Sequence, residues 1–319
     1  MYGRLLAALA LAAGPAASDP VLSLPIDCEL GETCYIQQFV DRDPGAGARD
    51  FTCGTLSYDG HKGTDFALPT LRAMQQGVDV RAAAPGIVQG TRNSMPDQLY
   101  TSDTAAQIDG RECGNGIVLK HEDGWETQYC HMRQGSIRVK SGDVIGAGTV
   151  LGQVGLSGKT QFPHLHLSVR KDGQVVDPFD TTEQAQCGQG GDSLWAETPD
   201  YVPGALMDVG FAPLVPEYDA ILAGDAAQDV LSDQSSGLVL YGLAYGGLKG
   251  DVMRIEIMGP DGPFGGQQVE LERNRARFFR AYGRRLTAER WPAGTYTGTV
   301  SLVRDGQVIS QKSTTATVQ

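Results

Sequence analysis

Histidine and aspartate recur at short spacings in two segments of this 319-residue chain. His61 lies four residues before Asp65, and a single leucine separates His164 from His166. His131 ends a strand-like run between these two segments. Histidine is the commonest protein ligand for metals and the side chain best suited to moving protons near neutral pH. The pattern therefore predicts a metal site that carries out hydrolysis.

A hydrolytic zinc site needs three protein ligands and a fourth position for water, whose pKa the metal lowers from about 15.7 to about 7. His61, Asp65 and one histidine of the 164/166 pair could supply the three ligands. A His-x-His pair on a strand places both rings on one face, about 6–7 Å apart along the strand. One ring can then bind the metal while the other stands beside the water, and His131 could also handle protons or stabilise an oxyanion.

Each of these features has an ordinary explanation when it stands alone. A His-x-x-x-Asp match arises often by chance, His-x-His is more often structural than metal-binding, and His131 could be a half-buried strand residue. Their joint presence, in this order and among glycine-rich turns, favours the metal site. His121 is expected on the surface of a hairpin, outside that site.

Short strands between glycine-rich turns are expected to position these side chains. The chain has 42 glycines, which favours a turn-rich antiparallel β domain over long helices. One hairpin is expected from residues 78–82 and 86–90, and a second from residues 117–121 and 125–131. Residues 91–111 have no clear periodicity and are expected to form a surface loop, either beside a substrate groove or as decoration.

Two features predict two domains: the length of the chain, and the change near residue 217 from a glycine- and proline-rich stretch to short strands separated by turns. We expect an N-terminal segment over residues 19–52, the histidine-bearing β domain over 53–187 and a glycine- and proline-rich linker over 188–216. Residues 217–319 contain several short strands separated by turns, which predicts a small immunoglobulin-like β-sandwich. This domain has no histidine and no cysteine, so no metal chemistry is expected there.

The beginning of the chain has the pattern of a signal peptide. Arg4 gives a positive start, residues 5–13 are apolar but too few to span a bilayer, and small residues follow. We assign residues 1–18 to this signal, with a buried N-terminal helix as the alternative. The mature protein is then expected to be exported, either periplasmic or secreted, and to have no membrane anchor. The net charge of −12 argues against nucleic acid as a partner.

Cysteine usage agrees with export, because an even number of cysteines in an exported chain favours disulfides. A thiol-ligated zinc site is the less favoured alternative, since no Cys-x-x-Cys spacing occurs. The expected pairs are Cys28–Cys34, which closes a small loop, Cys113–Cys130, which flanks the second hairpin, and, by elimination, Cys53–Cys187.

Taken together, these segments resemble the lysostaphin/LytM-like family of zinc metalloendopeptidases. The resemblance covers about residues 55–180 and depends on several motifs in order. They are His61-Lys62-Gly63-Thr64-Asp65-Phe66, the strand Tyr129-Cys130-His131-Met132, the glycine series of residues 142–158, and His164-Leu165-His166. This resemblance implies a Gly-rich antiparallel β-sheet metallopeptidase domain that hydrolyses peptide cross-links in bacterial peptidoglycan.

Carried over by position, the resemblance implies that His61, Asp65 and His166 bind Zn²⁺ and that His131 and His164 are the catalytic histidines. The implied mechanism is attack of zinc-activated water on a peptide carbonyl. His164 or His131 would accept the proton of that water, and the pair would stabilise the developing oxyanion.

Two departures from the family pattern leave the ligands intact: Ser168 stands where many members carry a glutamate, and Pro163 replaces a commoner small residue. The predicted function is a zinc-dependent endopeptidase acting on peptidoglycan stem peptides or cross-links. One alternative is a non-catalytic LytM-type regulator that activates a partner cell-wall amidase, and another is endopeptidase activity on proteins. The C-terminal domain would dock a protein partner, position the enzyme or bind the wall.

Overall fold

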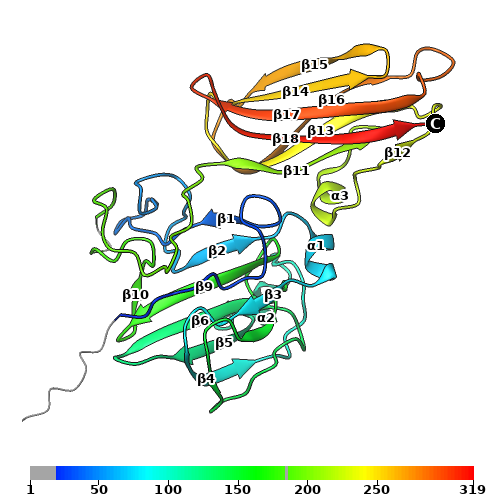
Figure 1. Cartoon of the computed structure of the whole chain (residues 1–319). Coiled ribbons are helices and arrows are strands. Elements are labelled where there is room, and N and C mark those ends of the chain that lie inside the picture. The colour runs from blue at the N-terminus through cyan, green and yellow to red at the C-terminus, as the bar shows by residue number, and fades with distance from the viewer. Residues whose placement is uncertain (1–18, 184–185) are drawn as a thin grey trace, which may run out of the picture.

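The pattern of burial along the central strands explains why this part of the chain forms a sheet. In β6 (Trp125–Met132), every second residue from Trp125 to Tyr129 is buried, as expected of a strand with one face on a core. The computed structural model describes residues 19–183 and 186–319, and it shows two β-rich bodies side by side (Figure 1). The all-β prediction is confirmed, whereas the expected signal peptide lies outside the described residues.

An antiparallel sheet in the N-terminal body carries His131, His164 and His166 on its strands, and His61 lies just before one of them. Its strands follow the order β1-β2-β9-β6-β5-β4-β7, with β10 paired to β9. These strands are β1 (Tyr35–Gln38), β2 (Thr64–Ala67), β4 (Gly86–Arg92), β5 (Asn115–Lys120), β6, β7 (Val144–Ile145), β9 (His164–Lys171) and β10 (Gln174–Val176). Strand β1 belongs to the N-terminal segment, so that segment forms one edge of the sheet (Figure 1).

One of the two expected hairpins is confirmed and the other is wrong. Strands β5 and β6 pair as an antiparallel hairpin. Strand β3 (Asp79–Arg81) pairs instead with β8 (Val150–Gln153), while β4 pairs with β5 and β7. The connection between β3 and β4 is not a surface turn. Its three alanines, residues 82–84, are buried in the core, and the Ala83 N–H donates to the Tyr129 hydroxyl.

The loop that separates β4 from β5 is held against the sheet. It contains the short helix α2 (Ala105–Ile108), whose Ile108 is buried. The amide of Asn115 accepts from Met95 N–H at 2.8 Å and donates to the Met95 carbonyl at 2.7 Å. The loop is therefore fixed near its start by the hydrogen bonds of Met95 and near its end by the buried Ile108.

All three expected disulfides are present, and they account for all six cysteines. Cys53–Cys187 ties the N-terminal part of the sheet domain to the segment that leaves it. Cys113–Cys130 joins a residue two positions before β5 to β6, directly beside His131.

The C-terminal body is a sandwich of two sheets, and its interior is apolar. One sheet has the order β11-β13-β16 and the other β12-β18-β17-β14-β15. Leu238 and Leu240 from the first sheet pack in one cluster with Ile255 and Val300 from the second. The strands are β11 (Ala205–Ala212), β12 (Val230–Leu231), β13 (Gly237–Gly247), β14 (Val252–Gly259), β15 (Gly262–Glu270), β16 (Arg275–Arg285), β17 (Gly294–Arg304) and β18 (Gln307–Val318).

Strand β11 corrects the expected extent of the linker over residues 188–216. Residues 205–212 pair with β13 along their whole length, and most of them are buried. Leu206 and Phe211 of this stretch pack into the core of the sandwich, although the prolines around it suggested a linker. The sandwich thus begins before residue 217.

The two bodies share one hydrophobic core. Residues of β13 alternate between the two sides: Leu238 and Leu240 face the sandwich interior, whereas Leu243 and Tyr245 join the core of the histidine-bearing sheet. The Tyr35 hydroxyl donates to the Met207 carbonyl at 2.9 Å, and its ring lies 5.8 Å from that of Tyr245. Two short helices, α1 (Leu71–Gln76) and α3 (Tyr218–Ala223), also meet across this boundary.

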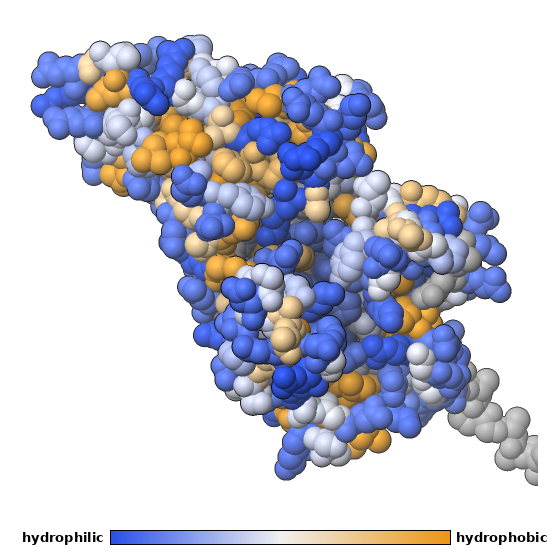
Figure 2. All heavy atoms as spheres, turned by 180° about the vertical axis from the view of Figure 1, so that it is seen from behind, coloured by the Kyte–Doolittle hydropathy of each residue, from blue (hydrophilic) through white to orange (hydrophobic). Residues whose placement is uncertain are grey.

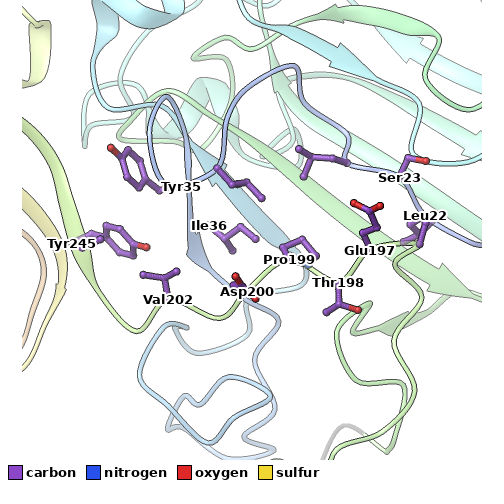
Figure 3. Close-up of a pocket in the computed structure, with 15 residues that line it drawn as sticks. Leu22, Ser23, Tyr35, Ile36, Glu197, Thr198, Pro199, Asp200, Val202 and Tyr245 are labelled. Atoms are coloured by element: carbon purple, nitrogen blue, oxygen red, sulfur yellow. The ribbon is translucent and has the colours of Figure 1, made fainter. Parts of the chain in front are cut away.

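A cavity of about 650 Å³ lies at this boundary, between the N-terminal segment, residues 196–202 and Tyr245 (Figure 3). None of the five histidines lines it. On the face seen in Figure 2, hydrophobic residues form small groups among hydrophilic ones and no continuous apolar surface. No helix in residues 19–183 and 186–319 is both long and apolar enough to cross a membrane.

Candidate metal centre

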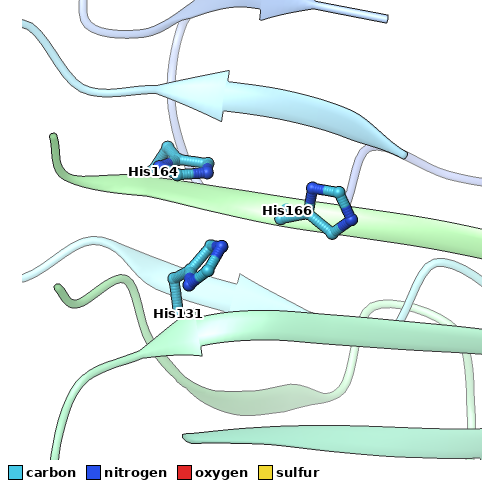
Figure 4. A group of neighbouring side chains, drawn as sticks. All are labelled: His131, His164 and His166. Carbon is cyan, nitrogen blue, oxygen red and sulfur yellow. The ribbon is translucent and has the colours of Figure 1, made fainter. Parts of the chain in front are cut away.

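Strand pairing brings the predicted metal-site residues to one place on the sheet. Asp65 on β2 is directly opposite His166 on β9, and His166 is also opposite Cys130 on β6. His164 and His131 lie at neighbouring ends of β9 and β6, with their rings close to each other (Figure 4). Sequence segments more than 30 residues apart therefore meet because β9 is the strand between β2 and β6.

His131 has an unusual backbone conformation that aims its side chain. Its φ is +61°, in the left-handed region that residues other than glycine rarely adopt. The pairing of β5 with β6 shifts at this point, since Asn115 is opposite Met132 and Ile117 is opposite Tyr129. An extra residue of this kind bends a strand and redirects a side chain. The His131 amide donates to the Cys113 carbonyl at 2.8 Å, which holds the bend.

Three atoms of the predicted ligand set converge at hydrogen-bond distance. Asp65 Oδ1 lies 2.8 Å from His166 Nδ1 and 3.2 Å from His61 Nε2. The two imidazole nitrogens, His61 Nε2 and His166 Nδ1, are 3.2 Å apart. The three side chains are buried or nearly so. They form the first of two ligand-type clusters in the described residues, the second being His131, His164 and His166.

The outward nitrogens of the two histidines in this set have acceptors of their own. His61 Nδ1 lies 2.7 Å from the Phe39 carbonyl, so it carries a proton and donates it. His166 Nε2 lies 3.0 Å from Ser168 Oγ, and that hydroxyl donates to the Lys62 carbonyl at 2.7 Å. Ser168 Oγ therefore accepts from His166 Nε2–H. In their neutral forms both rings would therefore turn a lone pair toward Asp65. Burial alone would lower the pKa of His61, but Asp65 raises it.

This arrangement fits zinc. When both rings are neutral, two imidazole lone pairs and a carboxylate oxygen converge, and a bound cation would offset the repulsion between them. Zinc bound tetrahedrally at about 2.0–2.1 Å would separate its ligand atoms by about 3.3 Å. The observed separations of 2.8, 3.2 and 3.2 Å are close to that value. A nitrogen and oxygen donor set is also one that zinc prefers.

The second pair of histidines, His131 and His164, lies beside this set. His131 Nδ1 lies 2.8 Å from the Ser157 carbonyl, and His164 Nδ1 lies 2.9 Å from the Phe162 carbonyl. Both Nδ1 atoms therefore donate, and in the neutral form of each ring Nε2 is then the acceptor. His164 Nε2 is 3.4 Å from Asp65 Oδ1, and the His131 and His164 rings are 4.6 Å apart between centroids.

The pKa values of the site residues reflect burial and mutual charge. Burial, followed by the neighbouring His164 and His166, lowers the pKa of His131 well below its ordinary value, so this ring is neutral at pH 7. Burial also lowers the pKa of His166, although Asp65 partly opposes this. Burial alone would raise the pKa of Asp65, but His61 and His164 lower it well below its ordinary value. Asp65 is thus a carboxylate at neutral pH.

Two aromatic side chains flank the site. The Tyr58 ring lies 4.4 Å from the His61 ring, and the Phe162 ring lies 4.4 Å from the His164 ring, each measured between centroids. Tyr58 is exposed and Phe162 is half-buried. Among the four histidines, the side chain of His166 remains part-exposed, at 14%.

The structure brings together all five predicted site residues and separates His121 from them. His121 is part-buried, and its ring nitrogens lie 2.7 Å from the Pro85 carbonyl and 2.9 Å from Thr127 Oγ1. Sequence reasoning missed the groups that fix the site histidines, namely the carbonyls of Phe39, Ser157 and Phe162 and the hydroxyl of Ser168. Ser168 alone gave a signal, because it departs from the family pattern.

Residues 59–178 match the model of peptidase family M23. A DD-carboxypeptidase/endopeptidase, Mpg, from Neisseria meningitidis serogroup B is 33% identical over 120 residues, which are 37% of this chain and 22% of that protein. The peptidoglycan DD-endopeptidase ShyA from Vibrio cholerae is 30% identical over 117 residues, again 37% of this chain and 22% of that protein. The chain thus matches about a fifth of the length of these relatives.

Among solved structures, the catalytic domain of the prophage-encoded M23 protein EnpA from Enterococcus faecalis is 31% identical. It covers 44% of this chain and 88% of its own, with a TM-score of 0.30. The matched region of the family model contains the whole set of His61, Asp65, His131, His164 and His166, and it ends before the sandwich.

Proposed function

Since residues 59–178 form a domain of peptidase family M23, we propose that this protein is a zinc-dependent endopeptidase that hydrolyses peptide bonds in bacterial peptidoglycan, in stem peptides or cross-links. The observation that carries this proposal is the convergence of His61 Nε2, Asp65 Oδ1 and His166 Nδ1, with the rings of His131 and His164 beside them. Relatives named as peptidoglycan DD-endopeptidase and as DD-carboxypeptidase/endopeptidase support the choice of substrate.

His61, Asp65 and His166 would hold the zinc. When bound, zinc supplies Lewis acidity, which activates water and polarises a carbonyl oxygen. The Nδ1 of His131 and of His164 lies on a backbone carbonyl, so the neutral form of either ring would accept the proton of the attacking water on Nε2. Once protonated, that ring would donate to the developing oxyanion or to the leaving amine. The Nδ1–H of each ring keeps its hydrogen bond to a backbone carbonyl, so neither ring has to flip during the reaction.

The proposed location is outside the cytoplasm, in the periplasm or secreted. Three disulfides, including one that spans 134 residues, support an oxidising compartment. Peptidoglycan is also found outside the cytoplasm, so the compartment and the proposed substrate agree.

The test is digestion of purified peptidoglycan followed by mass identification of the released fragments. We expect soluble peptide fragments, whose masses identify the bond that is cut. Release should stop with a zinc chelator and return when zinc is added back. His166→Ala should abolish it, while His121→Ala, a histidine outside the site, should leave it unchanged.

Hydrolysis that persists in chelator, or full activity of His166→Ala, would overturn the proposal. A protein that holds no zinc and cuts nothing, but stimulates a purified cell-wall amidase, would instead support a regulatory role. Metal analysis of the freshly purified protein separates these two outcomes.

A further inference from the structure

Arg277 of the sandwich is a cation without a carboxylate partner, close to the histidine pair. It lies on β16, opposite Tyr245 of β13. Its Nη2 donates to Gln37 Oε1 at 2.8 Å, and its guanidinium lies 4.5 Å above the ring centroid of Phe162. Within residues 19–183 and 186–319, its Nε is buried without an acceptor, and no Asp or Glu side chain forms an ion pair with it.

Two other arginines, Arg42 and Arg304, have carboxylate partners. Arg42 is fully buried between Asp177 and Asp180, at 3.5 Å and 3.9 Å. Arg304 donates two hydrogen bonds to Asp251, at 2.9 Å and 2.8 Å. Taking a cation out of water is unfavourable unless an opposite charge is close. Arg277 has only an amide oxygen and an aromatic ring in place of that charge.

Burial accordingly lowers the pKa of Arg277 to about 10, an effect that Tyr218 only partly opposes. The guanidinium still carries its proton at neutral pH. A cation in this state gains more from an anionic ligand than a fully hydrated surface arginine does, because it has fewer water contacts to lose. Planar guanidinium groups match carboxylates, with which they form paired hydrogen bonds.

Phe162 connects this cation to the site. The same ring that lies under the Arg277 guanidinium is stacked on His164, at 4.4 Å between centroids and 26° between planes. Gln37, the protein acceptor of Arg277, lies in β1, and its neighbour Gln38 pairs with Asp65. Arg277 is therefore only one aromatic ring away from a proposed catalytic histidine. In Figure 1, β1 is the edge strand of the sheet on the side where the sandwich packs.

We propose that Arg277 binds a carboxylate of the peptide substrate, so that the sandwich completes the substrate site of the peptidase domain. This inference rests on the proposed function. An extended peptide advances about 3.3 Å per residue, which places the recognised carboxylate within about three residues of the bond that is cut. The carboxylate is either the free C-terminus of a peptide or an acidic side chain.

Three synthetic peptides based on a released fragment test the proposal and distinguish these two sources. One keeps all its carboxylates, the second is amidated at the C-terminus and the third is amidated on its acidic side chain. For the wild-type protein, we expect amidation of the recognised carboxylate to raise KM about tenfold or more with little change in kcat. A wild-type protein that does not discriminate among the three peptides would overturn the proposal without any variant.

Variants of Arg277 provide the second arm. Arg277→Gln should raise KM for the fully charged peptide to the value that wild type shows for the amidated one, and it should leave the amidated peptide unaffected. Arg277→Lys should retain part of the preference. The matched control is Arg275→Gln, an exposed arginine on the same strand, which should behave as wild type. An equal loss on all peptides with Arg277→Gln would show a merely structural role and overturn the proposal.

Failure of this inference can be told apart from failure of the proposed function. If no peptide is hydrolysed, the proposed function fails, and binding of the same peptides is then measured by calorimetry. Tighter binding of the charged peptide to wild type, lost in Arg277→Gln, would still support the carboxylate site. Equal binding of charged and amidated peptides would overturn it.

Discussion

The hydroxyl of Ser168 lies 3.0 Å from Nε2 of His166 and donates to the carbonyl of Lys62 at 2.7 Å. Ser168 therefore links His166, a proposed zinc ligand on β9, to Lys62, the residue after the proposed ligand His61. Through this link Ser168 holds the proton of His166 on Nε2 and leaves Nδ1 free to face Asp65. A glutamate, which the family resemblance implies at this position, would have to reach the same nitrogen with a longer side chain.

Replacing Ser168 by alanine should weaken zinc binding. Outer groups that orient a ligand histidine contribute about 10- to 100-fold in metal affinity. We expect a loss in that range for Ser168→Ala, measured by competition with a chromophoric chelator. Ser102→Ala, at an exposed serine away from the site, serves as the control. Equal affinities of the two variants would show that Ser168 does not orient His166.

His131 and His166 should be separable by experiment, because only one of them belongs to the proposed ligand set. His131→Ala should keep one zinc per protein and lose about 10²- to 10⁴-fold in kcat, the usual contribution of a general acid–base group. His166→Ala should lose both the metal and the activity. Metal analysis combined with rates on one soluble substrate checks both statements. Loss of zinc from His131→Ala would place that histidine among the ligands instead.

The Cys113–Cys130 disulfide should matter for catalysis more than for metal binding. It joins Cys113, whose carbonyl accepts the hydrogen bond from the His131 N–H, to the residue just before His131. Replacing both cysteines by alanine should relax the left-handed backbone at His131 and lower kcat, while zinc affinity stays within about threefold of wild type. The same double replacement at Cys28 and Cys34, far from the histidines, is the control.

If the Cys113 and Cys130 double variant keeps the kcat of the wild type, then the hydrogen bonds of His131 hold the bend without the disulfide. If it loses zinc as well, the disulfide supports the whole site rather than His131.

Protonation of His131 should make the folded protein less stable in acid. Its pKa is lowered well below the ordinary value of 6.5 by burial and by His164 and His166. In the unfolded chain residue 131 takes up a proton near pH 6.5, whereas the folded protein keeps it neutral to lower pH. The folded state therefore binds fewer protons below pH 6.5, and its free energy of unfolding should fall as the pH drops, by up to about 1.4 kcal/mol per pH unit from this residue.

Denaturant unfolding of chelator-treated protein between pH 5 and 7 measures this slope. His131→Gln, which cannot take up the proton, should show a shallower dependence than wild type. The same slope in both proteins would mean that other groups account for the acid sensitivity.

The residues that have distinctive chemistry could be predicted from the sequence, and the structure brings the five of them together. The groups that fix their protons could not, because a backbone carbonyl such as that of Phe39 or Ser157 exists at every position and has no residue-type signal. The pairing of β3 with β8 was missed for a related reason. A turn of alanine and proline looks the same in sequence whether it is exposed or, as here, buried against Tyr129.

Arg277 shows the limit of local patterns more clearly. Nothing in the sequence around it distinguishes it from the other arginines of β16. Its surroundings come from Gln37 and Phe162, both more than a hundred residues away, and depend on how the sandwich packs on the sheet. Only the folded chain places these three side chains in contact.

The core that passes from the histidine-bearing sheet into the sandwich has a consequence for how such chains can change in evolution. Domains joined by a flexible tether can be exchanged or lost one at a time. Here Tyr35 on the sheet and Leu243 and Tyr245 of β13 belong to one interior. If another domain replaced the sandwich, the sheet domain would expose the apolar surface that the sandwich now covers. The two parts are therefore expected to be inherited as one unit, with compensating substitutions on both sides of their shared boundary.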